Sequence, residues 1–163
     1  MMDTLMGRRS IRKYQDKTVE GEKVRTILAA GRMAPSGKNK KPWEFIVAED
    51  RDTMLKLSQV KPKGGLFVKD APMGIVVVGD EEKSDTWVED CSIASTFMQL
   101  EAHNQGLGSC WVQFRGRFTP EGGDAEVRVR EILGIEEGRR VLCVITLGYP
   151  NEVKPPYKEE DYY

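Results

Sequence analysis

The fold of this chain is decided by one stretch of sequence, Met73-Gly74-Ile75-Val76-Val77-Val78-Gly79. The stretch is rich in β-branched side chains and does not alternate between apolar and polar residues, which is typical of a strand covered on both faces. A second run of the same kind lies near the C-terminus, Val141-Leu142-Cys143-Val144-Ile145-Thr146-Leu147. The two runs therefore predict the buried centre of a sheet with helices packed on it.

Before the central run, the sequence predicts one more strand and two helices. The segment Trp43-Glu44-Phe45-Ile46-Val47 reads as a strand. Apolar residues at helical spacing predict a helix over about residues 19–33, which Thr18 can cap and Pro35 ends. A second helix is expected over about residues 50–59, followed by a loop at residues 61–69 that is either a plain connection or a mobile cover over a site.

After the central run, the longest helical pattern covers about residues 85–105, and its apolar residues lie on more than one face. A second copy of the chain is one way to bury so much helix surface, so we expect a homodimer. A strand over residues 109–114 and a short helix over residues 124–133, closed by Gly134, complete the pattern. We expect an α+β sandwich, with a central mixed sheet of four or five strands flanked by helices, in a single domain over residues 1–163.

Composition excludes several classes of protein. The 163 residues carry 25 Lys+Arg and 26 Asp+Glu, a net charge of −1, so no overall field draws the chain to nucleic acid or an anionic membrane. No apolar stretch approaches the roughly 20 residues that cross a bilayer. The N-terminus lacks the order of charges of a signal peptide, so we expect a cytoplasmic protein.

The cysteines and the histidine indicate neither a disulfide framework nor a metal site. Three cysteines, Cys91, Cys110 and Cys143, lie among apolar neighbours, as reduced core thiols do. With a single histidine, His103, the chain has almost no ligands for zinc, so we expect no metal. His103 is better placed to interact with the end of the long helix than to act as a catalytic acid.

Three segments could bind a ligand. The first, Arg8-Arg9-Ser10-Ile11-Arg12-Lys13, combines guanidinium forks with a hydroxyl, a set that suits a phosphate monoester, although it could equally be a solvated basic turn. The second, residues 34–43, is a loop of small residues and amides that could grip the edge of a heterocycle or serve as an ordinary turn. The third, residues 106–111, has two glycines but lies between a helix and a strand, which is the wrong order for a dinucleotide-binding motif.

Taken together, four segments resemble the nitroreductase family of flavin enzymes. They read R-R-S-I-R at residues 8–12, A-P-S-G-K-N-x-x-P-W at residues 34–43, G-L-G-S-C-W at residues 106–111 and L-G-Y-P at residues 147–150. The resemblance implies a homodimer that holds FMN at two sites in the subunit interface. It also implies a ping-pong cycle in which NADH or NADPH gives hydride to flavin N5, and a nitroaromatic, quinone or similar small aromatic acceptor then takes the electrons.

The resemblance assigns residues to the cofactor but no catalytic acid or base. The residues that match the phosphate and ribityl contacts are Arg8, Arg9, Ser10 and Arg12; those of the loop that approaches the flavin from the partner subunit are Pro35, Ser36, Gly37 and Asn39; those that run beside the ring are Trp111, Val112 and Gln113. Among these, Gln113 is expected near the N5 edge. For the basic residue that the family offers to the phosphate after Pro150, Lys158 is the nearest match and Lys154 the alternative.

Two departures from the family pattern keep other functions open. Lys41 stands where many members have glutamine, and it either stabilises the reduced flavin or points to water. Gln113, Phe114 and Arg115 are bulkier than the glycines of many members, which puts the size of the acceptor in doubt. The alternatives are a flavin enzyme with another reductive reaction, such as dehalogenation, and a flavin-binding or redox-sensing protein with little turnover.

Overall fold

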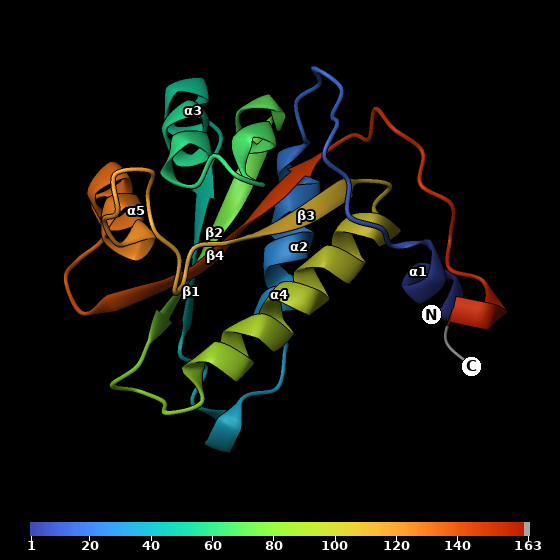
Figure 1. Ribbon diagram of the computed structural model, residues 1–163. Helices are drawn as coiled ribbons and strands as arrows, with labels where there is room; N and C mark the ends of the chain where they lie inside the picture. The colour runs from blue at the N-terminus through green and yellow to red at the C-terminus, as the bar shows by residue number, and fades with distance from the viewer. Residues whose placement is uncertain (162–163) are drawn as a thin grey trace.

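The computed structural model describes residues 1–161 and has a four-stranded sheet at its centre (Figure 1). The strands are β1 (Trp43–Ala48), β2 (Met73–Asp80), β3 (Gly108–Gln113) and β4 (Arg139–Gly148), in the order β1-β2-β4-β3. The two runs of β-branched residues thus form the two central strands. Ile75, Val76 and Ile145 are fully buried, and burial of each such side chain contributes roughly 1.5–3 kcal/mol.

The expectation of a mixed sheet is wrong for the described strands. Each of the three pairings, β1 with β2, β2 with β4 and β4 with β3, is antiparallel. The parallel pairing in the described residues is an isolated bridge between Ser10 and Ser109. The non-alternating runs arise because helices cover both faces of an antiparallel sheet, so burial on two sides does not require parallel strands.

Helices pack on the two faces of the sheet. One face is covered by α2 (Gly21–Arg32) and α4 (Trp87–Asn104), and the other by α3 (Arg51–Val60) and α5 (Ala125–Leu133). Alternate residues of β2 serve the two cores, since Ile75 and Val77 pack with α2 and α4 while Val76 and Val78 pack with α3 and α5. Three short 3-10 helices, η1 (Gly37–Asn39), η2 (Leu66–Asp70) and η3 (Glu159–Asp161), lie outside the sheet and the α-helices.

Most element boundaries agree with the sequence pattern, but the start of α2 does not. Thr18 was expected as its cap, whereas the helix begins at Gly21 with Glu20 as the capping residue and without a side-chain cap bond. The Glu20 carboxylate accepts a hydrogen bond from the Tyr149 hydroxyl at 2.7 Å instead. The predicted end of α5 is confirmed: Gly134 follows the last residue of the helix and has the left-handed conformation, with φ of 64°.

The N-terminal segment and the C-terminal tail run together along the β3 side of the sheet. After the short helix α1 (Met2–Gly7), Ile11 donates its N–H to the Ser109 carbonyl at 3.0 Å. The tail returns beside this segment, since Asn151 N–H bonds Lys13 O at 2.8 Å and Tyr157 N–H bonds Met6 O at 2.9 Å (Figure 1). Within residues 1–161, no helix is both long and apolar enough to span a membrane.

Candidate functional site

The outer edge of β3 presents backbone groups to a ligand. The Ser109 carbonyl turns away from β4, because it accepts from Ile11, whereas Phe114 N–H turns toward β4 and bonds Leu142 O at 3.0 Å. Backbone groups alternate in direction along a strand. The N–H and C=O groups of Trp111 and Gln113 therefore point to the same outer edge as those of Ser109.

The basic segment after α1 lies along the start of this edge. Ser10 forms its bridge with Ser109, and the guanidinium of Arg12 lies 5.8 Å from the centre of the Phe67 ring. Glu152 holds the segment in place, since its Oε1 accepts from the Arg12 N–H at 2.6 Å and from the Lys13 N–H at 3.2 Å. The structure thus brings the basic segment and the β3 edge together.

Arg8, Arg9 and Arg12 differ in how their guanidinium groups are engaged. Arg9 donates to the Pro155 carbonyl and stacks on the Tyr157 ring at 4.5 Å, so the tail occupies it. Arg8 and Arg12 make no ion pair with any carboxylate among residues 1–161. They are the two arginines of the segment that remain available to an anion.

The two C-terminal lysines, Lys154 and Lys158, differ in whether they line a pocket of about 280 Å³ beside the basic segment. Arg8, Arg9 and Lys154 all line it, and Lys154 pairs with Glu152 at 3.1 Å. Lys158 lies at the end of the tail beside α1 and pairs with Glu160 at 3.5 Å. Lys154 therefore shares a pocket with Arg8 and Arg9, and Lys158 is not among the residues that line it.

Side chains of β3 are connected by hydrogen bonds on the face turned to α4. The indole Nε1 of Trp111 donates to Gln113 Oε1 at 2.9 Å, and Gln113 Nε2 donates to Arg115 O at 3.0 Å. The amide of Gln113 is thus already engaged at both ends. Val112 points to the opposite face, where a Cβ built on Gly65 would lie 3.5 Å from its side chain.

The cover suggested for residues 61–69 is anchored in its second half. The Val68 side chain of η2 is fully buried, and η2 packs on α3. Phe67 is half-buried under the Arg12 guanidinium. Before η2, Gly65 is buried next to the Val112 side chain of β3.

The loop at residues 35–41 has a strained backbone that local bonds hold. Lys38, Asn39 and Lys41 have φ values of 50°, 54° and 47°, a left-handed conformation that costs residues other than glycine roughly 1–2 kcal/mol each. The Ser36 hydroxyl accepts from Lys41 N–H at 2.9 Å, and Lys83 Nζ donates to Lys41 O at 3.2 Å. The Lys41 side chain is exposed.

Asp90, in the first turn of α4, anchors this loop and was missed by the sequence reasoning. It is only 3% exposed, and its Oδ1 accepts the Gly37 N–H at 2.8 Å. Its Oδ2 accepts from the Ser84 hydroxyl at 3.2 Å and from Thr86 Oγ1 at 3.1 Å. A Cβ at Gly37 would lie 2.6 Å from Thr86 Oγ1, so glycine allows this close approach. The available signal was a carboxylate within an otherwise apolar helix face.

The loop and the basic segment lie at opposite ends of α4 within one copy of the chain (Figure 1). Gly37 bonds Asp90 in the first turn of the helix, whereas Gly7 lies against the His103 side chain in the last turn. At 1.5 Å per residue, an 18-residue helix is about 27 Å long. One copy therefore does not bring Pro35, Ser36 and Asn39 to Arg8 and Ser10.

The cysteines are not suited to nucleophilic chemistry. Burial raises the pKa of Cys91 to about 12, and burial also raises the pKa of Cys110 and Cys143. All three thiols are buried and unpaired with one another. They are protonated core residues near neutral pH.

The chain is similar to known proteins over nearly its whole length. A family model described as the nitroreductase family matches residues 5–63 and 59–149. The chain superposes with a TM-score of 0.96 on the structure of an FMN-dependent nitroreductase from Clostridium difficile, at 46% identity over 99% of this chain and 94% of that one.

Curated relatives extend the comparison. A protein of Methanothermobacter thermautotrophicus, named provisionally as an NADH dehydrogenase/NAD(P)H nitroreductase, is 41% identical over 93% of this chain and 78% of its own length. A more distant relative, at 23% identity over 99% of this chain and 94% of its own length, is the iodotyrosine deiodinase of Thermotoga neapolitana.

Proposed function

Because this chain belongs to the nitroreductase family, we propose that it is an FMN-dependent oxidoreductase that uses NADH or NADPH to reduce a nitroaromatic, quinone or similar acceptor. One observation carries the proposal. The basic segment of Arg8, Ser10 and Arg12 lies directly beside the free edge of β3, so a phosphate site adjoins a row of backbone donors and acceptors.

The chemistry of these groups fits FMN. Two guanidinium groups and a hydroxyl match the charge and the oxygens of a phosphate monoester. The edge of a strand offers alternating N–H and C=O groups in a plane, which suits the polar rim of a flat heterocycle. When bound, the flavin supplies the two-electron chemistry between nicotinamide and acceptor.

In this proposal the residues of the chain position the flavin and do not react themselves. The Trp111 indole donates a hydrogen bond to the Gln113 amide, and the Gln113 amide donates one to the Arg115 carbonyl. These two bonds fix the end of β3 before a ligand binds. Since both ends of the Gln113 amide are engaged, this residue meets a ligand through its backbone. Burial raises the pKa values of the three thiols, so they do not act as acids near neutral pH, and we propose water as the proton source for the product.

The site is proposed to be completed by a second copy. The ends of α4 are farther apart than the length of a flavin nucleotide, so the loop at residues 35–41 can reach a flavin only in another subunit. Ile93 and Phe97 of α4 are 38% and 39% exposed. A contact between copies through this helix would cover them and bring the loop of one copy to the β3 edge of the other.

The visible spectrum of the purified protein tests the proposal. We expect flavin absorbance that bleaches when NADH or NADPH is added without oxygen, and release of FMN on denaturation. Reoxidation by a nitroaromatic or quinone under multiple turnover would separate an enzyme from a sensor. A protein that takes up no FMN, or whose bound flavin neither nicotinamide reduces, would contradict the proposal.

Reductive dehalogenation is a second candidate, which the deiodinase relative favours. The same bound flavin would then deliver its electrons to a halogenated aromatic ring. Release of halide from a halotyrosine in the presence of reduced enzyme would support this reaction over nitro reduction.

A further inference from the structure

Four cations at the far end of the β3 edge are not used by the proposed phosphate site. They are Lys61, Lys63, Arg115 and Arg117, and no carboxylate among residues 1–161 forms an ion pair with any of them. In the same chain, other arginines such as Arg128, Arg139 and Arg140 do have carboxylate partners. Since only seven of the 25 Lys+Arg have an ion pair within residues 1–161, it is the position of these four beside β3 that distinguishes them.

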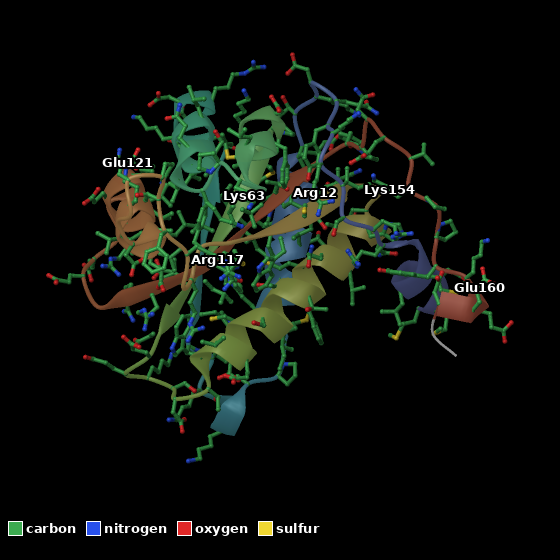
Figure 2. The ribbon with its side chains drawn as sticks, in the orientation of Figure 1. Arg12, Lys63, Arg117, Glu121, Lys154 and Glu160 are labelled. Atoms are coloured by element: carbon green, nitrogen blue, oxygen red, sulfur yellow. The ribbon has the colours of Figure 1, made fainter. Side chains whose placement is uncertain are left out.

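These cations come from two loops that flank the same part of β3. A Cβ built on Gly65 would lie 3.5 Å from the Val112 side chain, so the loop of Lys61 and Lys63 reaches β3 from the α3 face, whereas Arg115 contacts Trp87 on the α4 face. Arg115 follows Val112 by three residues, and Arg117 is held by its N–H bond to Phe114 O at 2.9 Å. In Figure 2 the labels of Arg12, Lys63 and Arg117 surround β3, whereas those of Glu121 and Glu160 lie toward the two outer sides.

Arg115 is positioned before any ligand binds. Its guanidinium lies 5.6 Å from the centre of the Trp87 ring, a cation–π contact with a side chain that is only 5% exposed. Its backbone is held by N–H donation to Leu142 O at 3.1 Å and by the Gln113 amide. Less conformational freedom is lost when such a group binds an anion than when a free side chain does.

The proposed second copy would add further positive charge. Its loop at residues 35–41 carries Lys38, Lys40 and Lys41, and none of these pairs with a carboxylate in the described part of the chain. Unpaired charges of one sign around a concave site raise the local concentration of ligands of the opposite sign. The FMN phosphate would be bound near Arg8 and Arg12, at the other end of the β3 edge.

We propose that the site takes an anionic substrate, and that Arg115 and Arg117, with Lys61 and Lys63, determine this specificity. The inference rests on the proposed function. The shared chemistry is a phosphate or carboxylate group held at the mouth of the site. Its source is either the 2′-phosphate of NADPH or an acidic group on the electron acceptor, and the two sources are separable because they act in different half-reactions.

The test measures the two half-reactions of the FMN-loaded protein separately by anaerobic stopped flow. Flavin reduction is compared for NADPH and NADH, and reoxidation for 4-nitrobenzoate and its neutral counterpart 4-nitrobenzamide. Because the paired compounds differ in intrinsic reactivity, the quantity of interest is how the rate ratio of each pair, NADPH to NADH or 4-nitrobenzoate to 4-nitrobenzamide, changes in the double variant Arg115→Ala/Arg117→Ala. We expect that ratio to fall at least threefold in one half-reaction, and the wild-type ratio to fall as salt rises.

The variant Lys56→Gln is the matched control, since it removes a positive charge from the outer side of α3, where Lys56 pairs with Asp52. Its ratios should equal those of wild type. The flavin spectrum of the double variant reports whether the cofactor is still bound. Ratios that fall less than threefold in both half-reactions of a flavin-loaded double variant would overturn this inference and leave the proposed function standing. A wild-type flavin that neither nicotinamide reduces would contradict both.

Discussion

Asp90 Oδ1 accepts the backbone N–H of Gly37 at 2.8 Å, a bond that joins the first turn of α4 to the loop at residues 35–41. The carboxylate is almost fully buried and has two further donors, Ser84 and Thr86. One side chain therefore holds a loop whose neighbouring residues adopt a left-handed backbone. In the proposed dimer, this loop meets the flavin of the other copy.

Replacing Asp90 should loosen the loop and weaken flavin binding. Asp90→Ala leaves the Gly37 N–H without its acceptor, so we expect a loss of about 1–3 kcal/mol in the free energy of unfolding. FMN affinity should also fall several-fold. Asp90→Asn keeps one oxygen acceptor and should have a smaller effect on both quantities. Urea unfolding and FMN fluorescence quenching measure them, with Glu137→Gln, at an exposed position away from α4, as the control. Unchanged FMN affinity in Asp90→Ala would show that Asp90 does not support flavin binding through the loop at residues 35–41.

Removing a guanidinium from the phosphate site should distinguish FMN from riboflavin. Loss of a charge-assisted hydrogen bond is worth about 1.5–3 kcal/mol, so Arg12→Ala should raise the Kd for FMN by about tenfold or more. Riboflavin has no phosphate, and its Kd should stay within about twofold. Arg51→Ala, which removes a cation paired with Asp16, controls for overall charge. Equal weakening of both flavins would show that Arg12 does not contact the phosphate.

The exposed apolar residues of α4 should be required for assembly. Phe97→Asp places a carboxylate in the proposed contact between copies, where burial of an unpaired charge is strongly unfavourable. We expect light scattering to show a monomer that retains little FMN. Leu55→Asp changes an apolar residue of similar exposure on α3 and should leave both mass and flavin content unchanged. A Phe97→Asp protein with the same mass and flavin content as wild type would argue for a different interface.

The buried thiols should make the protein less stable at alkaline pH. The pKa of Cys91 is about 12 in the folded chain, whereas a thiol in the unfolded chain has a pKa near 8.5. Above about pH 9 the folded state binds more protons than the unfolded state, so the free energy of unfolding falls as pH rises. Each such thiol contributes at most about 1.4 kcal/mol per pH unit.

Urea unfolding between pH 7.5 and pH 10.5 measures this dependence. Cys91→Ala should reduce the slope with pH, although it also lowers stability at every pH by leaving a small cavity. In the native protein at pH 8, iodoacetamide should leave the three thiols unmodified. Rapid alkylation without unfolding would contradict their placement in the core.

The amino-acid sequence by itself was enough to predict the strands and the main helices. Residues 73–79 and 141–147 predict the central strands because hydrophobic burial depends on side-chain type, which is written in the sequence. The segment at residues 8–12 predicts anion binding because guanidinium chemistry is local. The end of α5 at Gly134 follows from the backbone freedom of one residue.

Relations between distant residues were decided only by tertiary structure. Burial on two faces is compatible with either strand direction, so the antiparallel order of the sheet depends on how the connections cross it. That Lys154, and not Lys158, lines a pocket with Arg8 and Arg9 depends on the path of the tail beside α1. The bond from Asp90 to Gly37 joins residues 53 positions apart. Composition and spacing carry no information on such contacts, since a pair of groups becomes close only when the intervening chain has packed.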